Sequence, residues 1–143
     1  MKLKMPPKIK VLEALGAIAD GRIHKLGEGK YEVISSEGIR KYTVIISGNK
    51  VFSDDNGTKF RDYVGYPIIS ALILEGKLDY NDKIAQALKG IPWKKLNEQE
   101  KKYSLVEDII RKEVESKGIK WEEVEEIRNK ILEKLKHLSL EKM

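Results

Sequence analysis

Carboxylate side chains offer the first candidate chemistry in this chain of 143 residues. Asp54, Asp55 and Asp62 are close in sequence, and such a cluster could bind a hard cation or serve in acid–base catalysis. Their spacing is not that of an EF-hand loop, and no nucleophile or partner base accompanies them. Because acids of this kind also favour turns and the first turn of a helix, we prefer the structural interpretation.

Metal and nucleophile chemistry have little support elsewhere. The chain has no cysteine and only two histidines, His24 and His137, which are far apart in sequence. This composition excludes disulfides, thiolate nucleophiles and sulfur-ligated zinc, and we expect both histidines to be solvated. No glycine-rich phosphate loop, GxSxG elbow or metalloprotease motif occurs, so we expect no enzymatic activity, no metal and no cofactor.

Basic side chains form the strongest candidate binding site. Residues 1–96 carry 17 basic and 11 acidic residues, whereas residues 97–143 carry 11 and 12. Tyr42, Phe52 and Tyr63 lie near several of the basic residues in sequence and could stack on bases, as nucleic-acid surfaces require. The alternative is a lysine-rich surface that serves solubility alone. The predicted nucleic-acid-binding residues, for DNA or RNA, are Lys2, Lys4, Lys8, Lys10, Arg40, Lys41, Lys59 and Arg61.

Length and composition point to a small globular protein. With 36% charged and 41% hydrophobic residues, the chain can bury a core and is not disordered. The longest apolar stretch, Tyr66 to Leu74, is too short to cross a bilayer. Residues 1–10 lack the apolar segment of a signal peptide, so we expect a cytoplasmic protein without membrane contact. Abundant Lys, Glu and Ile resemble the composition of thermophile proteins.

The pattern of the first 90 residues predicts an α+β domain. An apolar stripe predicts a helix from Pro7 to Asp20, ended by Gly21. Alternating and β-branched residues predict strands at 31–35, 40–47 and 51–53, with a further short strand possible at 22–26. The three main strands form an antiparallel meander, and a buried helix that starts near Gly65 and stops at Gly76 packs on it. A shorter helix spans residues 78–89.

Residues 91–143 are predicted to be a helical C-terminal part. Asn97 and Glu100 fit a capping box at the start of a helix that Gly118 closes. The last helix carries apolar residues in steps of three and four, with acids at its start and lysines at its end. The two helices form an αα-hairpin. We therefore expect two parts, residues 1–90 and 91–143, with the second packed on the first or on a second copy.

The front part resembles the SWIM zinc-finger family, whose signature is CxC, a spacer and CxH. The stretches Tyr31-Glu32-Val33 and Tyr42-Thr43-Val44 are similar to its first two strands, and Asp55 stands where the family often has Asp after its CxC pair. Ile69, Ala71, Leu72 and Gly76 match the apolar stripe and terminal glycine of its helix. The resemblance covers about a third of the chain, or about half with the first helix.

The metal ligands of that family are missing here. The CxC positions are held by Val51 and Ser53, and the CxH positions by Tyr66 and Ile68, none of which offers sulfur or imidazole to zinc. If the resemblance holds, apolar packing has replaced the metal, and Val51, Tyr66 and Ile68 should cluster in the core. The resemblance implies a module that binds DNA or protein partners.

The C-terminal hairpin suggests a second function. It carries more apolar residues than two short helices need against each other, and the excess could form a symmetric dimer. The predicted self-association residues are Ile127, Ile131, Leu135 and Leu138. The sequence thus predicts a non-enzymatic interaction module that binds nucleic acid or a protein partner, or alternatively a structural protein that assembles through its hairpin.

Overall fold

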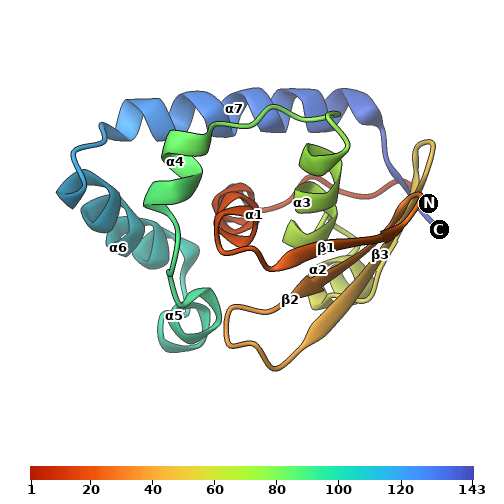
Figure 1. Ribbon diagram of the computed structural model, residues 1–143, viewed down its shortest axis with the longest axis horizontal. Coiled ribbons are helices and arrows are strands. Elements are labelled where there is room, and N and C mark those ends of the chain that lie inside the picture. The colour runs from red at the N-terminus through yellow and green to blue at the C-terminus, as the bar shows by residue number, and fades with distance from the viewer.

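Two apolar helices form the centre of the structure. The computed structural model describes residues 1–143, and in it α1 (Ile9–Ala19) packs against α3 (Tyr66–Leu74) (Figure 1). Most residues of both helices are buried, as expected for helices that are apolar around most of their circumference. α1 also contacts α4 (Asp82–Ala87) and α7 (Trp121–Leu138), whereas α3 contacts the sheet. The α+β class predicted from the sequence is confirmed.

The sheet has five strands in the order β1-β2-β3-β4-β5. β1 (Ile23–Gly27), β2 (Lys30–Ile34), β3 (Lys41–Ser47) and β4 (Lys50–Ser53) form an antiparallel meander. The predicted three strands correspond to β2, β3 and β4, and the possible strand at 22–26 is β1. Gly48 has a φ of +59° in the two-residue turn between β3 and β4, a conformation that glycine adopts without strain.

The inner face of the sheet contributes to one core with both central helices. Val51 and Ile68 are fully buried members of this core, and Tyr66 is half-buried and packs against it. The Tyr66 ring meets the Tyr42 ring edge to face, with 6.3 Å between their centroids. The expected packing of these three side chains is therefore present. Ancestry from a zinc finger stays a prediction.

The helix boundaries differ from the prediction at two places. Asn97 lies inside α5 (Trp93–Gln99), and the chain leaves helical geometry at Glu100 before α6 (Tyr103–Ser116) begins. The predicted capping box at Asn97 and Glu100 is therefore wrong. A short helix, α2 (Asn56–Arg61), also forms where only a turn was expected, because the Asp55 carboxylate accepts a hydrogen bond from the Thr58 backbone N–H and caps it.

The chain ends lie side by side at one end of the sheet (Figure 1). β5 (Glu141–Lys142) pairs in parallel with β4, and the Lys142 backbone N–H donates to the Met1 carbonyl at 2.7 Å. Leu140, which precedes β5, is 4% exposed and belongs to the core. The C-terminal segment is thus part of the sheet.

The C-terminal helices contribute to the same core as the front of the chain. Ile127, Ile131 and Leu135 are buried, and Leu138 is half-buried and packed against the core. These side chains are covered within one chain, and their role in self-association stays a prediction. No helix combines the length and apolar character needed to cross a membrane.

Candidate functional site

A cleft of about 400 Å³ lies where α1, α2 and α5 meet the 35–40 loop. Four basic residues line it, namely Lys10, Arg40, Arg61 and Lys94, together with five aromatic residues, Tyr42, Tyr63, Tyr66, Trp93 and Tyr103. We call it the tyrosine cleft. Its walls come from segments that are far apart in sequence, so only the folded chain brings these residues together.

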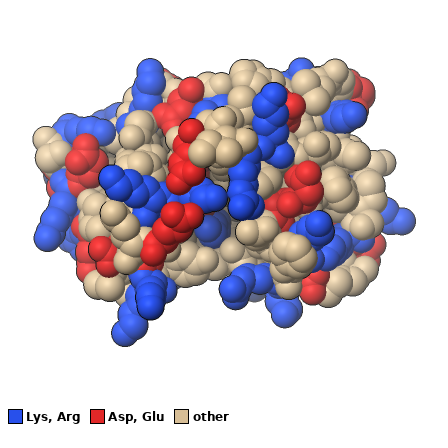
Figure 2. Space-filling view, turned by 90° about the horizontal axis from the view of Figure 1, so that it is seen from below, with Lys and Arg blue, Asp and Glu red and all other residues tan.

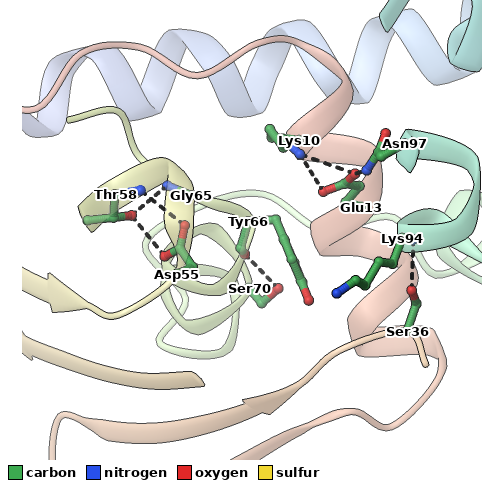
Figure 3. Close-up of polar contacts among 10 residues, drawn as sticks. All are labelled: Lys10, Glu13, Ser36, Asp55, Thr58, Gly65, Tyr66, Ser70, Lys94 and Asn97. Carbon is green, nitrogen blue, oxygen red and sulfur yellow. Dashed lines mark hydrogen bonds and ion pairs between the residues drawn. The ribbon is translucent and has the colours of Figure 1, made fainter. Parts of the chain in front are cut away.

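The 35–40 loop is held to the rest of the cleft by serine hydroxyls. The Arg40 backbone N–H donates to Ser35 Oγ at 3.1 Å, which closes the loop and places Arg40 at the cleft. Ser36 Oγ accepts a hydrogen bond of 3.0 Å from the Lys94 backbone N–H (Figure 3). The loop and the start of α5 are therefore fixed relative to each other.

A buried polar network holds α2 on the opposite wall. The Asp55 carboxylate accepts hydrogen bonds from the hydroxyls of Ser53 and Thr58 and from the Thr58 backbone N–H. Thr58 Oγ1 in turn accepts from the Gly65 backbone N–H at 3.1 Å. A Cβ atom at Gly65 would lie 2.0 Å from Asp55 Oδ2, so this close approach requires glycine. The network fixes α2, which carries Arg61, against the start of α3.

A charged group occupies the α1 side of the cleft. Glu13 is only 2% exposed, and its carboxylate accepts hydrogen bonds from Lys10 Nζ at 3.1 Å and from Asn97 Nδ2 at 2.6 Å (Figure 3). A buried carboxylate needs such partners. The Lys10 ammonium also lies 5.3 Å from the centre of the Tyr103 ring. Lys10 is therefore engaged within the protein and is not a free cation.

Three tyrosines of the cleft, Tyr42, Tyr63 and Tyr66, are uncharged at neutral pH. Burial raises the pKa of Tyr66, and burial together with the neighbouring Tyr103 raises the pKa of Tyr63. Burial also raises the pKa of Tyr42, although the positive charge of Arg40 acts in the opposite direction. These hydroxyls can donate or accept hydrogen bonds, and they add no negative charge that would repel an anion.

Arg40 and Arg61 are the cations of the cleft without an ion-pair partner. Both are exposed and line the cleft, and neither takes part in a salt bridge, whereas Lys10 pairs with Glu13 and Lys94 lies 3.8 Å from Glu98. The Lys94 side chain points toward the Tyr66 hydroxyl (Figure 3). An arginine guanidinium can bind a phosphate or carboxylate through two parallel hydrogen bonds. The cleft thus offers anion-binding groups beside aromatic rings.

The structure brings together only part of the predicted basic set. Lys10, Arg40 and Arg61 line the tyrosine cleft, while Lys2, Lys4, Lys8, Lys41 and Lys59 are exposed elsewhere. Figure 2 views the molecule from the side of α5 and the 35–40 loop, and basic and acidic side chains are intermixed there without a continuous basic strip. The predicted basic residues are therefore not gathered into one surface.

Several cleft residues were not among the predicted site residues. Glu13, Tyr66, Lys94, Asn97 and Tyr103 come from α1, α3, α5 and α6. Among these residues only Glu13 has a signal in the sequence: it lies in the middle of the apolar stripe of the first helix, where a buried acid requires partners. His24 and His137 are exposed, as expected. Asp55 has the structural role preferred from the sequence, and Asp62 pairs with Lys142 at 2.8 Å.

A second and wider depression lies between the turns of the sheet and the end of α3. Its volume is larger, about 940 Å³, but its charged groups are paired within the protein. Lys77 contacts Glu75, Lys25 contacts Glu28, and the Tyr31 hydroxyl donates to Glu75 Oε2 at 2.8 Å. We therefore regard the smaller tyrosine cleft, with its unpaired arginines, as the better candidate site. No group of three or more His, Asp or Glu side chains could hold a metal ion.

One comparison with known proteins gives a match. A model of the family described as "Uncharacterised conserved protein UCP014422" matches residues 3–141. No curated protein and no solved structure matches the chain.

Proposed function

The chain belongs to this UCP014422 family, and we propose from the geometry of its tyrosine cleft that it is a non-enzymatic module that binds single-stranded nucleic acid. One observation carries the proposal, which is that Arg40 and Arg61 have no ion-pair partner and share a cleft with four tyrosines. Single-stranded nucleic acid offers phosphates to the guanidinium groups and unpaired bases to the rings.

The electrostatics of the cleft support an anionic ligand. Three acidic residues, Glu13, Asp55 and Glu98, line the cleft beside its four basic residues. Glu13 pairs with Lys10 and Glu98 lies 3.8 Å from Lys94, which leaves the two arginines unpaired for an approaching phosphate. The aromatic walls favour bases that are free to stack, which a duplex does not present.

The alternative of self-assembly through the C-terminal hairpin has less support. Ile131 and Leu135 would have to leave the core of the chain to meet a second copy. Opening a packed core for this purpose would cost several kcal/mol per large side chain. A protein partner remains compatible with the cleft if it presents an acidic segment, and the experiment below separates it from nucleic acid.

Fluorescence anisotropy with a labelled single-stranded oligonucleotide tests the proposal. Binding should weaken as salt rises, with a slope of about −0.7 in log–log form for each phosphate contact. Arg40→Ala and Arg61→Ala should each reduce the affinity roughly three- to tenfold, as loss of a charge-assisted hydrogen bond predicts. Lys89→Ala makes the same change in net charge at an exposed residue outside the cleft and serves as the matched control.

The result is clear in either direction. The proposal requires the arginine variants to lose affinity while Lys89→Ala keeps it, and requires a duplex of the same sequence to bind less well. Equal losses in all three variants would show a non-specific charge effect. Absence of binding at low salt, together with binding of an acidic peptide, would favour the protein partner and reject the proposal.

A further inference from the structure

The size of the tyrosine cleft limits its occupant. Its volume of about 400 Å³ lies near the lower end of the range for small-molecule sites. A groove that follows several nucleotides needs a row of cations along the strand, and the face in Figure 2 shows basic side chains broken up by acidic ones. The cleft therefore has room and charge for one nucleotide and not for a run of them.

The exposed side of the cleft suits the phosphate of that nucleotide. Arg40 follows Ile39, which is 77% exposed, and Arg61 follows Phe60, which is 69% exposed. These are among the most exposed large apolar residues of the chain. Neither apolar residue lines the cleft, so the two unpaired guanidinium groups are what the cleft offers to a phosphate.

One hydrogen-bond acceptor among the residues that line the cleft lacks a donor. Asn97 Nδ2 donates to Glu13, and this contact fixes the orientation of the amide. Asn97 Oδ1 is left buried with no hydrogen-bond partner. A buried acceptor without a donor is uncommon and costs stability. An N–H group brought by a ligand would satisfy Asn97 Oδ1, with the Glu13 carboxylate beside it as a second acceptor.

The exocyclic amino group of cytosine, adenine or guanine carries two N–H donors, one for each of these acceptors, whereas uracil and thymine offer one ring N–H between two carbonyl oxygens. We infer that the cleft holds one nucleotide, with its phosphate at Arg40 and Arg61 and an amino-bearing base against Asn97. This inference rests on the proposed function. The base lies among the tyrosine rings, where Tyr66 and Lys94 point toward each other (Figure 3).

Competition by two mononucleotides tests this inference. Cytidine monophosphate and uridine monophosphate have nearly the same shape, but cytosine presents an amino group where uracil presents a carbonyl. Each displaces a bound labelled oligocytidine, and we expect cytidine monophosphate to do so at about tenfold lower concentration. Cytidine without phosphate should compete poorly, because it leaves both arginines without an anion.

Two variants locate the effect. Arg61→Ala should weaken both mononucleotides by a similar factor. Asn97→Ala should remove most of the difference between them, and its thermal unfolding without ligand shows whether it is folded. The comparison of the two mononucleotides on the unmodified protein needs no variant, so the inference is tested even if Asn97→Ala does not fold.

A free nucleotide and the end of a strand share this chemistry, and a circular oligocytidine separates them. If the linear form binds more tightly than the circular form and more tightly than cytidine monophosphate, the ligand is a strand end. If the linear form and cytidine monophosphate bind equally, the ligand is a free nucleotide.

The inference is overturned if the circular form binds as well as the linear one or if uridine monophosphate competes as well as cytidine monophosphate. If the oligonucleotide binds but no mononucleotide displaces it, the inference fails and the proposed function stands. If no nucleic acid or nucleotide binds, both fail.

Discussion

Tyr31 shows how a single hydroxyl links the two layers of the molecule. It lies on the inner face of β2, and its hydroxyl donates to Glu75 Oε2 at the end of α3 at 2.8 Å. Burial and this carboxylate raise the pKa of Tyr31 from about 10 to about 12. The folded state therefore keeps a proton that the unfolded state releases.

The sign of the resulting pH dependence follows from this difference. Below about pH 10 both states hold the proton, and the contribution of Tyr31 to stability is fully present. Between about pH 10 and 12 only the folded state holds it, so the free energy of unfolding falls as pH rises. In Tyr31→Phe we expect the free energy of unfolding to fall less steeply with pH, and the difference in slope should correspond to about one proton. Urea unfolding at several alkaline pH values measures this slope. An unchanged slope would show that Tyr31 does not titrate in this way.

At the scale of single residues, the sequence predicted some of the basic residues that line the cleft, but not the residues with which they pair. Arg40 and Arg61 were predicted as binding residues and do line the cleft. Lys10 was also predicted as a binding residue and lines the cleft, but it pairs with Glu13 three residues along α1. The i,i+3 spacing of Lys10 and Glu13 is a local signal of such a pair, whereas the contact of Glu13 with Asn97, 84 residues away in sequence, has no local signal.

The strand β5 attaches the C-terminal end of the chain to the edge of the sheet. It has only two residues, Glu141 and Lys142, yet it extends the sheet and buries Leu140. We expect Leu140→Ala to lower the free energy of unfolding by about 2–4 kcal/mol, as for other buried leucines. Leu74→Ala makes the same chemical change at a side chain that is 47% exposed, and should cost about 1 kcal/mol or less.

Urea unfolding of both leucine variants measures the difference. If Leu140→Ala costs no more than Leu74→Ala, the C-terminal segment does not hold the sheet edge as described. The α1 and α3 helices would then have to supply the stability assigned to this contact.

Long, patterned elements were predictable and short ones were not. α1, α3 and α7 have apolar stripes. The predicted ranges of α1 and α3, which end at the stop signals Gly21 and Gly76, agree closely with the structure, and α7 forms where the last helix was expected. β5 and α2 are too short to show periodicity. The break between α5 and α6 falls at Glu100 and two lysines, which have no strong preference against helix, so tertiary packing decides it.

At the scale of the whole molecule, binding depends on the way the chain folds back on itself. The tyrosine cleft combines α1 and the 35–40 loop from the front of the chain with α5 and Tyr103 from the back. The overall excess of basic residues predicted an anionic partner, but charge totals contain no information about position. The number of basic residues alone suggests a broad basic surface, whereas Figure 2 shows basic and acidic side chains intermixed on this face.

Mapping by nuclear magnetic resonance tests most directly the claim that the tyrosine cleft is the binding site. Backbone amide resonances are followed while a short single-stranded oligonucleotide is added to the labelled protein. We expect the largest shifts at Arg40, Gly57, Tyr66 and Asn97, and little change at Lys2, which is exposed outside the cleft. Shifts confined to the first lysines, or no shifts at saturating oligonucleotide, would contradict the assignment of nucleic-acid binding to this cleft.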